Sequence, residues 1–95
     1  MRMMMKVKID TEKGNEALKS GRLPQLFQEL MAKVNPEAAY FGLEDGHRCG
    51  FVVFDMTDQA TMPVIGEPLF LELGASISLT PVMTGEDLAK GLQMM

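Results

Sequence analysis

The chain has few of the residues on which several protein classes depend. Its 95 residues contain no tryptophan, one cysteine and one histidine, and aromatic side chains make up 6% of the total. A single cysteine excludes an intramolecular disulfide, so the chain is not a disulfide-stapled extracellular domain, and a reducing cytoplasm is the expected location. Because structural zinc requires a set of several cysteines and histidines, no metal site is expected either.

Positive charge and long apolar segments are also scarce. Nine lysines and arginines stand against thirteen aspartates and glutamates, which gives a formal net charge of −4. Such a chain lacks the basic surface that attracts nucleic acid or an anionic membrane, so neither is an expected partner. No stretch approaches the roughly 20 apolar residues of a transmembrane helix, and Met1–Lys6 is too short for the apolar segment of a signal peptide.

The remaining composition is that of an ordinary folded domain. Hydrophobic residues make up 46% of the chain and charged residues 23%, values close to the average for globular proteins. Because 95 residues suffice for one hydrophobic core and not for two, residues 1–95 are expected to form a single domain.

Runs of alternating or β-rich residues predict four strands. These strands are expected over residues 3–9, 38–43, 48–56 and 76–83. The second and third flank Glu44-Asp45-Gly46-His47, and Asp-Gly between two such runs predicts a β-hairpin. Pro81 indicates that the end of the fourth strand lies at a sheet edge, because proline cannot donate a hydrogen bond to a neighbour.

Helical spacing of apolar residues occurs between these strands. A first helical segment is expected after a cap at Asp10 or Thr11, with a break at Ser20-Gly21. Beyond this break, apolar residues recur at helical spacing: Leu23, Leu26, Phe27, Leu30, Met31 and Val34. Asn35-Pro36 is expected to end this helix.

Two further helices are expected. One has its cap at Thr57-Asp58 and ends at Gly74, and Pro68 predicts that it is bent or begins late. Thr84 and Asp87 resemble a capping box that opens a short C-terminal helix carrying Leu88 and Leu92.

The element order predicts an α+β fold of the ferredoxin-like βαββαβ type, with an antiparallel sheet, the helices on one face and a short C-terminal helix. The third strand is nevertheless apolar on both sides. One side carries Cys49, Phe51 and Val53, and the other carries Gly50, Val52, Phe54 and Met56. Because an apolar patch of this size rarely stays exposed, we expect a second copy of the chain to cover it in a sheet-to-sheet homodimer.

In its element order, its two-sided third strand and the ending Thr80-Pro81-Val82-Met83-Thr84 before a short helix, the chain resembles the dimeric α+β barrel superfamily. The resemblance covers nearly the whole chain. It implies two ferredoxin-like sheets facing each other around a partly hollow apolar centre, with the last strand and helix reaching across the dimer. The superfamily includes cofactor-free monooxygenases, isomerases, haem-handling enzymes and stress-responsive proteins, so the fold leaves the function open.

One candidate site lies at the centre of the expected dimer. Lys6, Lys8, Tyr40 and Phe54 are expected on the sheet face turned away from the helices, where an apolar cavity with a few polar groups suits a small-molecule ligand. We expect the homodimer to bind an apolar or weakly acidic small molecule there, without a cofactor, with a lysine pairing an acidic group and Tyr40 forming a hydrogen bond.

An alternative is that these lysines pair across the interface with Asp55 or Glu44 and that the aromatic rings only fill the interface. The assignment also depends on strand register, because a shift of one residue within residues 48–56 exchanges the two faces of the strand.

The alternative to a binding function is an enzymatic one that depends on His47. It is the one side chain whose ordinary charge change lies near neutral pH, so with Tyr40 or Arg48 it is a candidate proton-transfer group of a cofactor-free monooxygenase or isomerase. A histidine in a hairpin turn is otherwise solvated, and Cys49 is expected to be a buried apolar residue rather than a nucleophile. A regulatory amino-acid-binding module with this element order would instead hold its ligand at helix-side interfaces.

Overall fold

The computed structural model, which describes residues 1–95, contains a four-stranded antiparallel sheet and four helices. The elements in chain order are β1 (Arg2–Lys8), α1 (Thr11–Ser20), α2 (Arg22–Val34), β2 (Ala38–Glu44), β3 (His47–Asp55), α3 (Thr61–Leu73), β4 (Ser76–Pro81) and α4 (Gly85–Gln93). The predicted α+β class and the four strands are therefore confirmed, with strand ends shifted by one or two residues.

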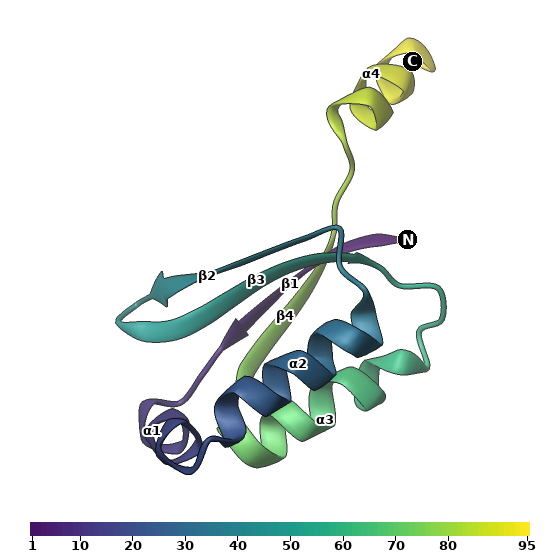
Figure 1. Cartoon of the computed structure of the whole chain (residues 1–95). Helices are drawn as coiled ribbons and strands as arrows, with labels where there is room; N and C mark the ends of the chain where they lie inside the picture. The colour runs from purple at the N-terminus through teal and green to yellow at the C-terminus, as the bar shows by residue number, and fades with distance from the viewer.

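The strand order in the sheet is β2-β3-β1-β4. This order and the sequence of elements are compatible with a ferredoxin-like fold. Helices α1, α2 and α3 lie on one side of the sheet, as Figure 1 shows, and no helix covers the other side. β4 is an edge strand, as Pro81 predicts.

The core lies between the helices and the sheet. Its inward-facing strand partners are Met3 with Phe54, Met5 with Val52, and Val7 with Gly50. Helices α2 and α3 contribute Leu26, Leu30, Val34, Ile65, Leu69 and Leu73. Because side chains alternate across a strand, this pairing also fixes which residues face away from the helices.

Local signals set most helix ends where the sequence places them. The Asp10 carboxylate accepts a hydrogen bond from the backbone N–H of Lys13 at 3.1 Å and so caps α1. Gly21 separates α1 from α2 with φ of +81°, in the left-handed region that glycine adopts without strain. Asn35 ends α2, also in a left-handed conformation.

Helix α3 begins later than the expected cap at Thr57-Asp58. Its first residue is Thr61, and Ala60 occupies the capping position without a side-chain hydrogen bond. The Asp58 carboxylate instead accepts from the N–H of Ala60 at 2.9 Å, which stabilises the turn before the helix. The helix then continues through Pro68 to Leu73.

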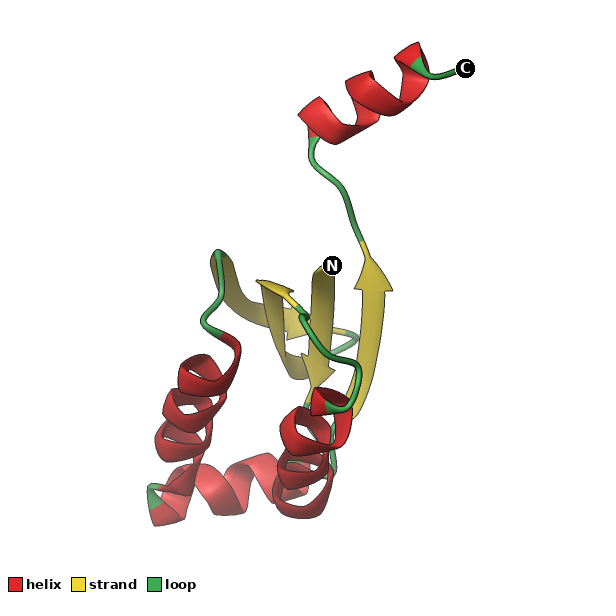
Figure 2. Cartoon of the chain, turned by 90° about the vertical axis from the view of Figure 1, so that its right-hand side faces the viewer, coloured by secondary structure: helices red, strands yellow, loops and turns green.

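Helix α4 projects away from the sheet and from the other helices (Figures 1 and 2). None of its residues is buried, and the predicted capping box of Thr84 and Asp87 is present. An ion pair of 3.5 Å joins Arg2 to Asp87 at the start of the helix. The radius of gyration is 15.0 Å, compared with about 12 Å for a compact chain of this length.

Candidate functional site

The sheet face opposite the helices, here called the open face, carries an apolar patch. The patch consists of Met4 on β1, Ala38 and Tyr40 on β2, and Phe51 and Val53 on β3. Tyr40 is 71% exposed and Met4 is 38% exposed. Phe51 lies directly between Tyr40 and Lys6 in the register, so the patch adjoins a basic side chain.

Lys6, Lys8 and Tyr40 lie on the open face, as predicted, but Phe54 does not. Phe54 pairs with Met3 on the helix side and is only 2% exposed. Both faces of β3 are apolar, so composition alone does not decide which face meets the helices. The pairing with β1 decides it and places Phe51, rather than Phe54, beside Tyr40.

The structure does not bring His47, Tyr40 and Arg48 together. His47 pairs with Glu44 on the open face, and its Nδ1 lies 2.9 Å from the carbonyl oxygen of Asp45. On β2, Tyr40 lies four residues before Glu44, the partner of His47. This separation is roughly 13 Å, at about 3.3 Å per residue along a strand. Arg48 faces the helices, where its Nη2 donates to Asn15 at 2.9 Å.

Both open-face lysines pair with acidic side chains of the same chain. Lys6 Nζ donates to Glu44 Oε1 at 2.7 Å, and this hydrogen bond raises the pKa of Lys6. Lys8 lies 3.6 Å from Asp45. The pairing of a lysine with Glu44 therefore occurs within one chain and needs no interface.

Cys49 lies on the open face beneath the ion pair of Lys6 and Glu44, which joins β1 to β2 across β3. It is buried, and this burial raises the pKa of its thiol. A thiol with a raised pKa is protonated at neutral pH and is a poor nucleophile. This agrees with the expectation of a small buried apolar residue.

Two apolar cavities on the helix side were not anticipated from the sequence. The first, here called the Arg48 cavity, has a volume of about 420 Å³ and is lined mainly by Ile9, Leu23, Phe27, Phe41, Leu43 and Arg48. The second has a volume of about 500 Å³ and lies between α3 and β4. The alternation of side chains along β2 places Phe41 and Leu43 toward the helices, and this was the one sequence signal for the Arg48 cavity. A cavity also depends on how the helices pack above these residues, which the alternation does not show.

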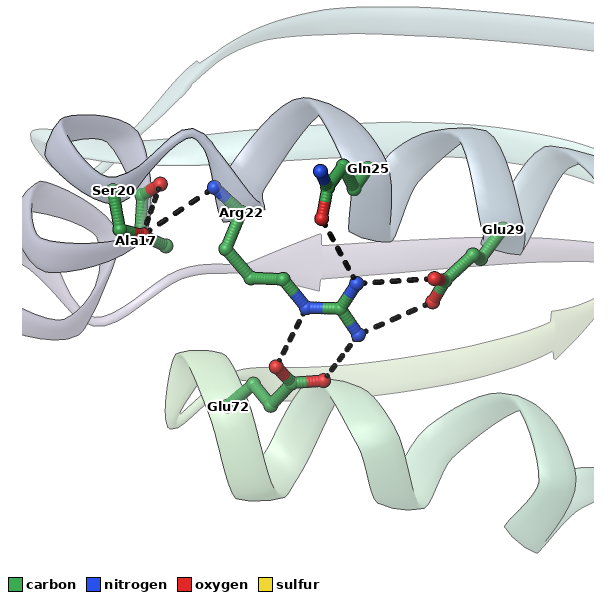
Figure 3. Close-up of polar contacts among 6 residues, drawn as sticks. All are labelled: Ala17, Ser20, Arg22, Gln25, Glu29 and Glu72. Atoms are coloured by element: carbon green, nitrogen blue, oxygen red, sulfur yellow. Dashed lines mark hydrogen bonds and ion pairs between the residues drawn. The ribbon is translucent and has the colours of Figure 1, made fainter.

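Arg22 forms a separate polar cluster that joins α2 to α3 (Figure 3). Its Nε and Nη2 donate to Glu72 at 2.8 and 2.9 Å, and Nη1 and Nη2 donate to Glu29 at 3.0 and 3.3 Å. Nη1 also donates to Gln25 at 3.4 Å. All five N–H donors of this guanidinium have partners within the chain, so the cluster holds two helices together and offers no free donor to a ligand.

No protein-family model, curated protein or solved structure matches this chain. None of its helices is long and apolar enough to span a membrane. The structure also contains no cluster of three or more histidine, cysteine or acidic side chains able to hold a metal ion.

Proposed function

We propose that two copies of the chain pack through their open faces and hold an apolar or weakly acidic small molecule between the two sheets. The observation that carries this proposal is the uncovered apolar patch around Tyr40 and Phe51, which no element of the same chain shields. Water-exposed apolar patches of this kind are typical of interaction sites.

Helix α4 supports the proposal independently. It has nine residues, too few for a stable isolated helix in water, and yet none of them is buried against the body. Leu88 and Leu92 lie one turn apart and are 51% and 57% exposed. A second copy is the occupant that would cover both the patch and this helix, and the arrangement corresponds to the dimeric α+β barrel.

The chemistry of the open face suggests the class of ligand. Apolar side chains dominate, and the polar groups near them are Lys6, Lys8 and the Tyr40 hydroxyl, which makes no hydrogen bond within the chain. A weakly acidic ligand would compete with Glu44 for Lys6 and accept a hydrogen bond from Tyr40. Apolar walls with a few oriented polar groups are typical of small-molecule sites.

The enzymatic alternative has no assembled site in its favour. A cofactor-free monooxygenase or isomerase that used His47 would need Tyr40 or Arg48 near the same substrate. His47 and Arg48 occupy opposite faces of the sheet, and Tyr40 lies several residues away along the strands. The geometry therefore favours binding over catalysis.

Native mass spectrometry of freshly purified protein tests the proposal. We expect a dimer whose additional mass disappears on denaturation. Tyr40→Glu combined with Phe51→Glu should give a folded monomer, because two carboxylates would be buried at the interface. The control Leu71→Glu, at an exposed position on α3, should remain dimeric. A wild-type monomer at all concentrations would contradict the dimer, and a dimer that never carries or accepts a small acid would contradict the ligand.

A further inference from the structure

We propose that the Arg48 cavity is a second binding site, specific for a small apolar monocarboxylate. This site lies within one chain on the helix side of the sheet and is independent of the proposed dimer. Its volume of about 420 Å³ falls within the usual range of small-molecule sites, roughly 300 to 1,000 Å³.

The charge of the cavity selects an anion. Arg48 is the one charged side chain in its lining. No ion pair of the chain involves Arg48, and its guanidinium makes a single hydrogen bond, to Asn15. The other donors are therefore free for a carboxylate, which a guanidinium binds through two parallel hydrogen bonds. Arg22, in contrast, has all five N–H donors occupied within the chain, so the free donors of Arg48 follow from its position and not from its residue type.

The remaining lining selects an apolar body for the ligand. Leu23, Phe27 and Phe41 contribute side chains, and the two phenylalanine rings meet edge to face with centroids 5.4 Å apart. No acidic side chain lines the cavity. The ammonium group of an amino acid would have no partner there, so a simple carboxylic acid fits the site and a free amino acid does not.

Two glycines in the interior of regular elements open the space that this site needs. A Cβ on Gly14 of α1 would lie 2.6 Å from Arg48 Nη1, so a larger residue there would displace the guanidinium from its place against this helix. A Cβ on Gly50 of β3 would lie 3.3 Å from the Phe41 ring. Glycine weakens a helix interior by about 1 kcal/mol relative to alanine. At Gly14 this unfavourable choice coincides with the placement of the one unpaired arginine.

The test is calorimetric titration with 2-naphthoate and with its neutral isostere 2-naphthamide. Wild-type protein should bind the acid at least about tenfold more tightly than the amide, because only the acid forms charge-assisted hydrogen bonds with Arg48. Arg48→Gln should weaken binding of the acid by about tenfold or more and leave binding of the amide nearly unchanged.

Two further variants separate this site from simple misfolding and from the open face. Gly14→Ala should displace the guanidinium and weaken binding of the acid, and an unchanged circular dichroism spectrum should show that the fold is retained although the new Cβ would also lie 3.0 Å from Ile9 Cγ2. Lys6→Gln, which removes the open-face lysine, should leave the roughly tenfold loss of acid affinity caused by Arg48→Gln unchanged. The proposal is overturned if Lys6→Gln weakens binding of the acid while Arg48→Gln does not, if the wild type binds acid and amide equally, or if no saturable binding occurs at the solubility limit of the acid.

Discussion

Arg22 uses all five of its guanidinium N–H groups within the chain, whereas Arg48 uses one. Both are half-buried arginines that reach a neighbouring helix, Arg22 from α2 and Arg48 from β3, so residue type alone does not separate their roles. Their surroundings separate the two roles. Arg22 faces Glu29 and Glu72, while Arg48 lies against Gly14 of α1 and lines an apolar cavity. The first arginine is structural, and the second is the candidate ligand group.

At the residue scale, the Arg22 cluster predicts a pH-dependent stability. The hydrogen bonds from Arg22 lower the pKa of Glu72. A carboxylate whose folded pKa is lowered stabilises the fold fully above its unfolded pKa of about 4.3, and this stabilisation is lost as the pH falls through the folded value. Glu72→Gln should therefore lower the thermal midpoint at neutral pH, and its difference from wild type should shrink below about pH 4.

Thermal unfolding followed by circular dichroism across this pH range measures the effect. The matched control is Glu67→Gln on the same helix, because Glu67 forms no ion pair and should give a small difference at every pH. A Glu72→Gln difference that stayed constant down to strongly acidic pH would show that the ion pair is not its source.

Local signals made most elements predictable from the sequence. The Asp10 cap, the break at Gly21 and the Thr84 capping box act within a few residues, so a linear sequence contains all of their partners. The face of Phe54 was not predictable, because both sides of β3 are apolar and only pairing with β1 assigns them. The Arg48 cavity depends on a contact between Gly14 and Arg48, which no local pattern encodes.

At the element scale, α3 contains an interior proline whose missing hydrogen bond has a substitute. Pro68 has no N–H to donate to the carbonyl of Val64, four residues earlier. Lys33 Nζ of α2 donates to that carbonyl at 3.4 Å. The proline thus leaves an acceptor exposed on α3, and a lysine from the neighbouring helix occupies it.

Pro68→Ala is expected to raise the free energy of unfolding by about 1 to 2 kcal/mol, because it restores the backbone hydrogen bond and the gain exceeds the added entropy of the unfolded chain. Lys33→Met should destabilise the wild type more than it destabilises Pro68→Ala, since the restored N–H then occupies the Val64 carbonyl. Urea denaturation of the two single variants and the double variant measures this coupling. Additive effects would mean that Lys33 does not replace the missing bond.

At the scale of the whole molecule, the unusual feature is the distance of α4 from the rest of the chain. The longest extent is 52 Å and the shortest is 17 Å, so the molecule is elongated mainly by this one helix (Figure 2). An extended arm ending in an amphipathic helix can be stable only if its apolar side is covered. Within the proposed dimer, the partner provides that cover.

This dependence predicts that the helicity of α4 changes with protein concentration. Leu88→Gln with Leu92→Gln removes the apolar side of the helix without changing its charge, and we expect the dimer to dissociate at least about tenfold more readily, because two apolar side chains are lost from the interface.

Glu86→Gln, on the same helix, is the matched control for a change outside the apolar side. Light scattering after size-exclusion chromatography reports the oligomeric state, and circular dichroism of the same dilution series reports the helicity. If α4 docked on its own chain in solution, the Leu88 and Leu92 variant would lose helicity equally at every concentration. A loss that grows with dilution in the wild type therefore identifies a second copy as the partner of α4.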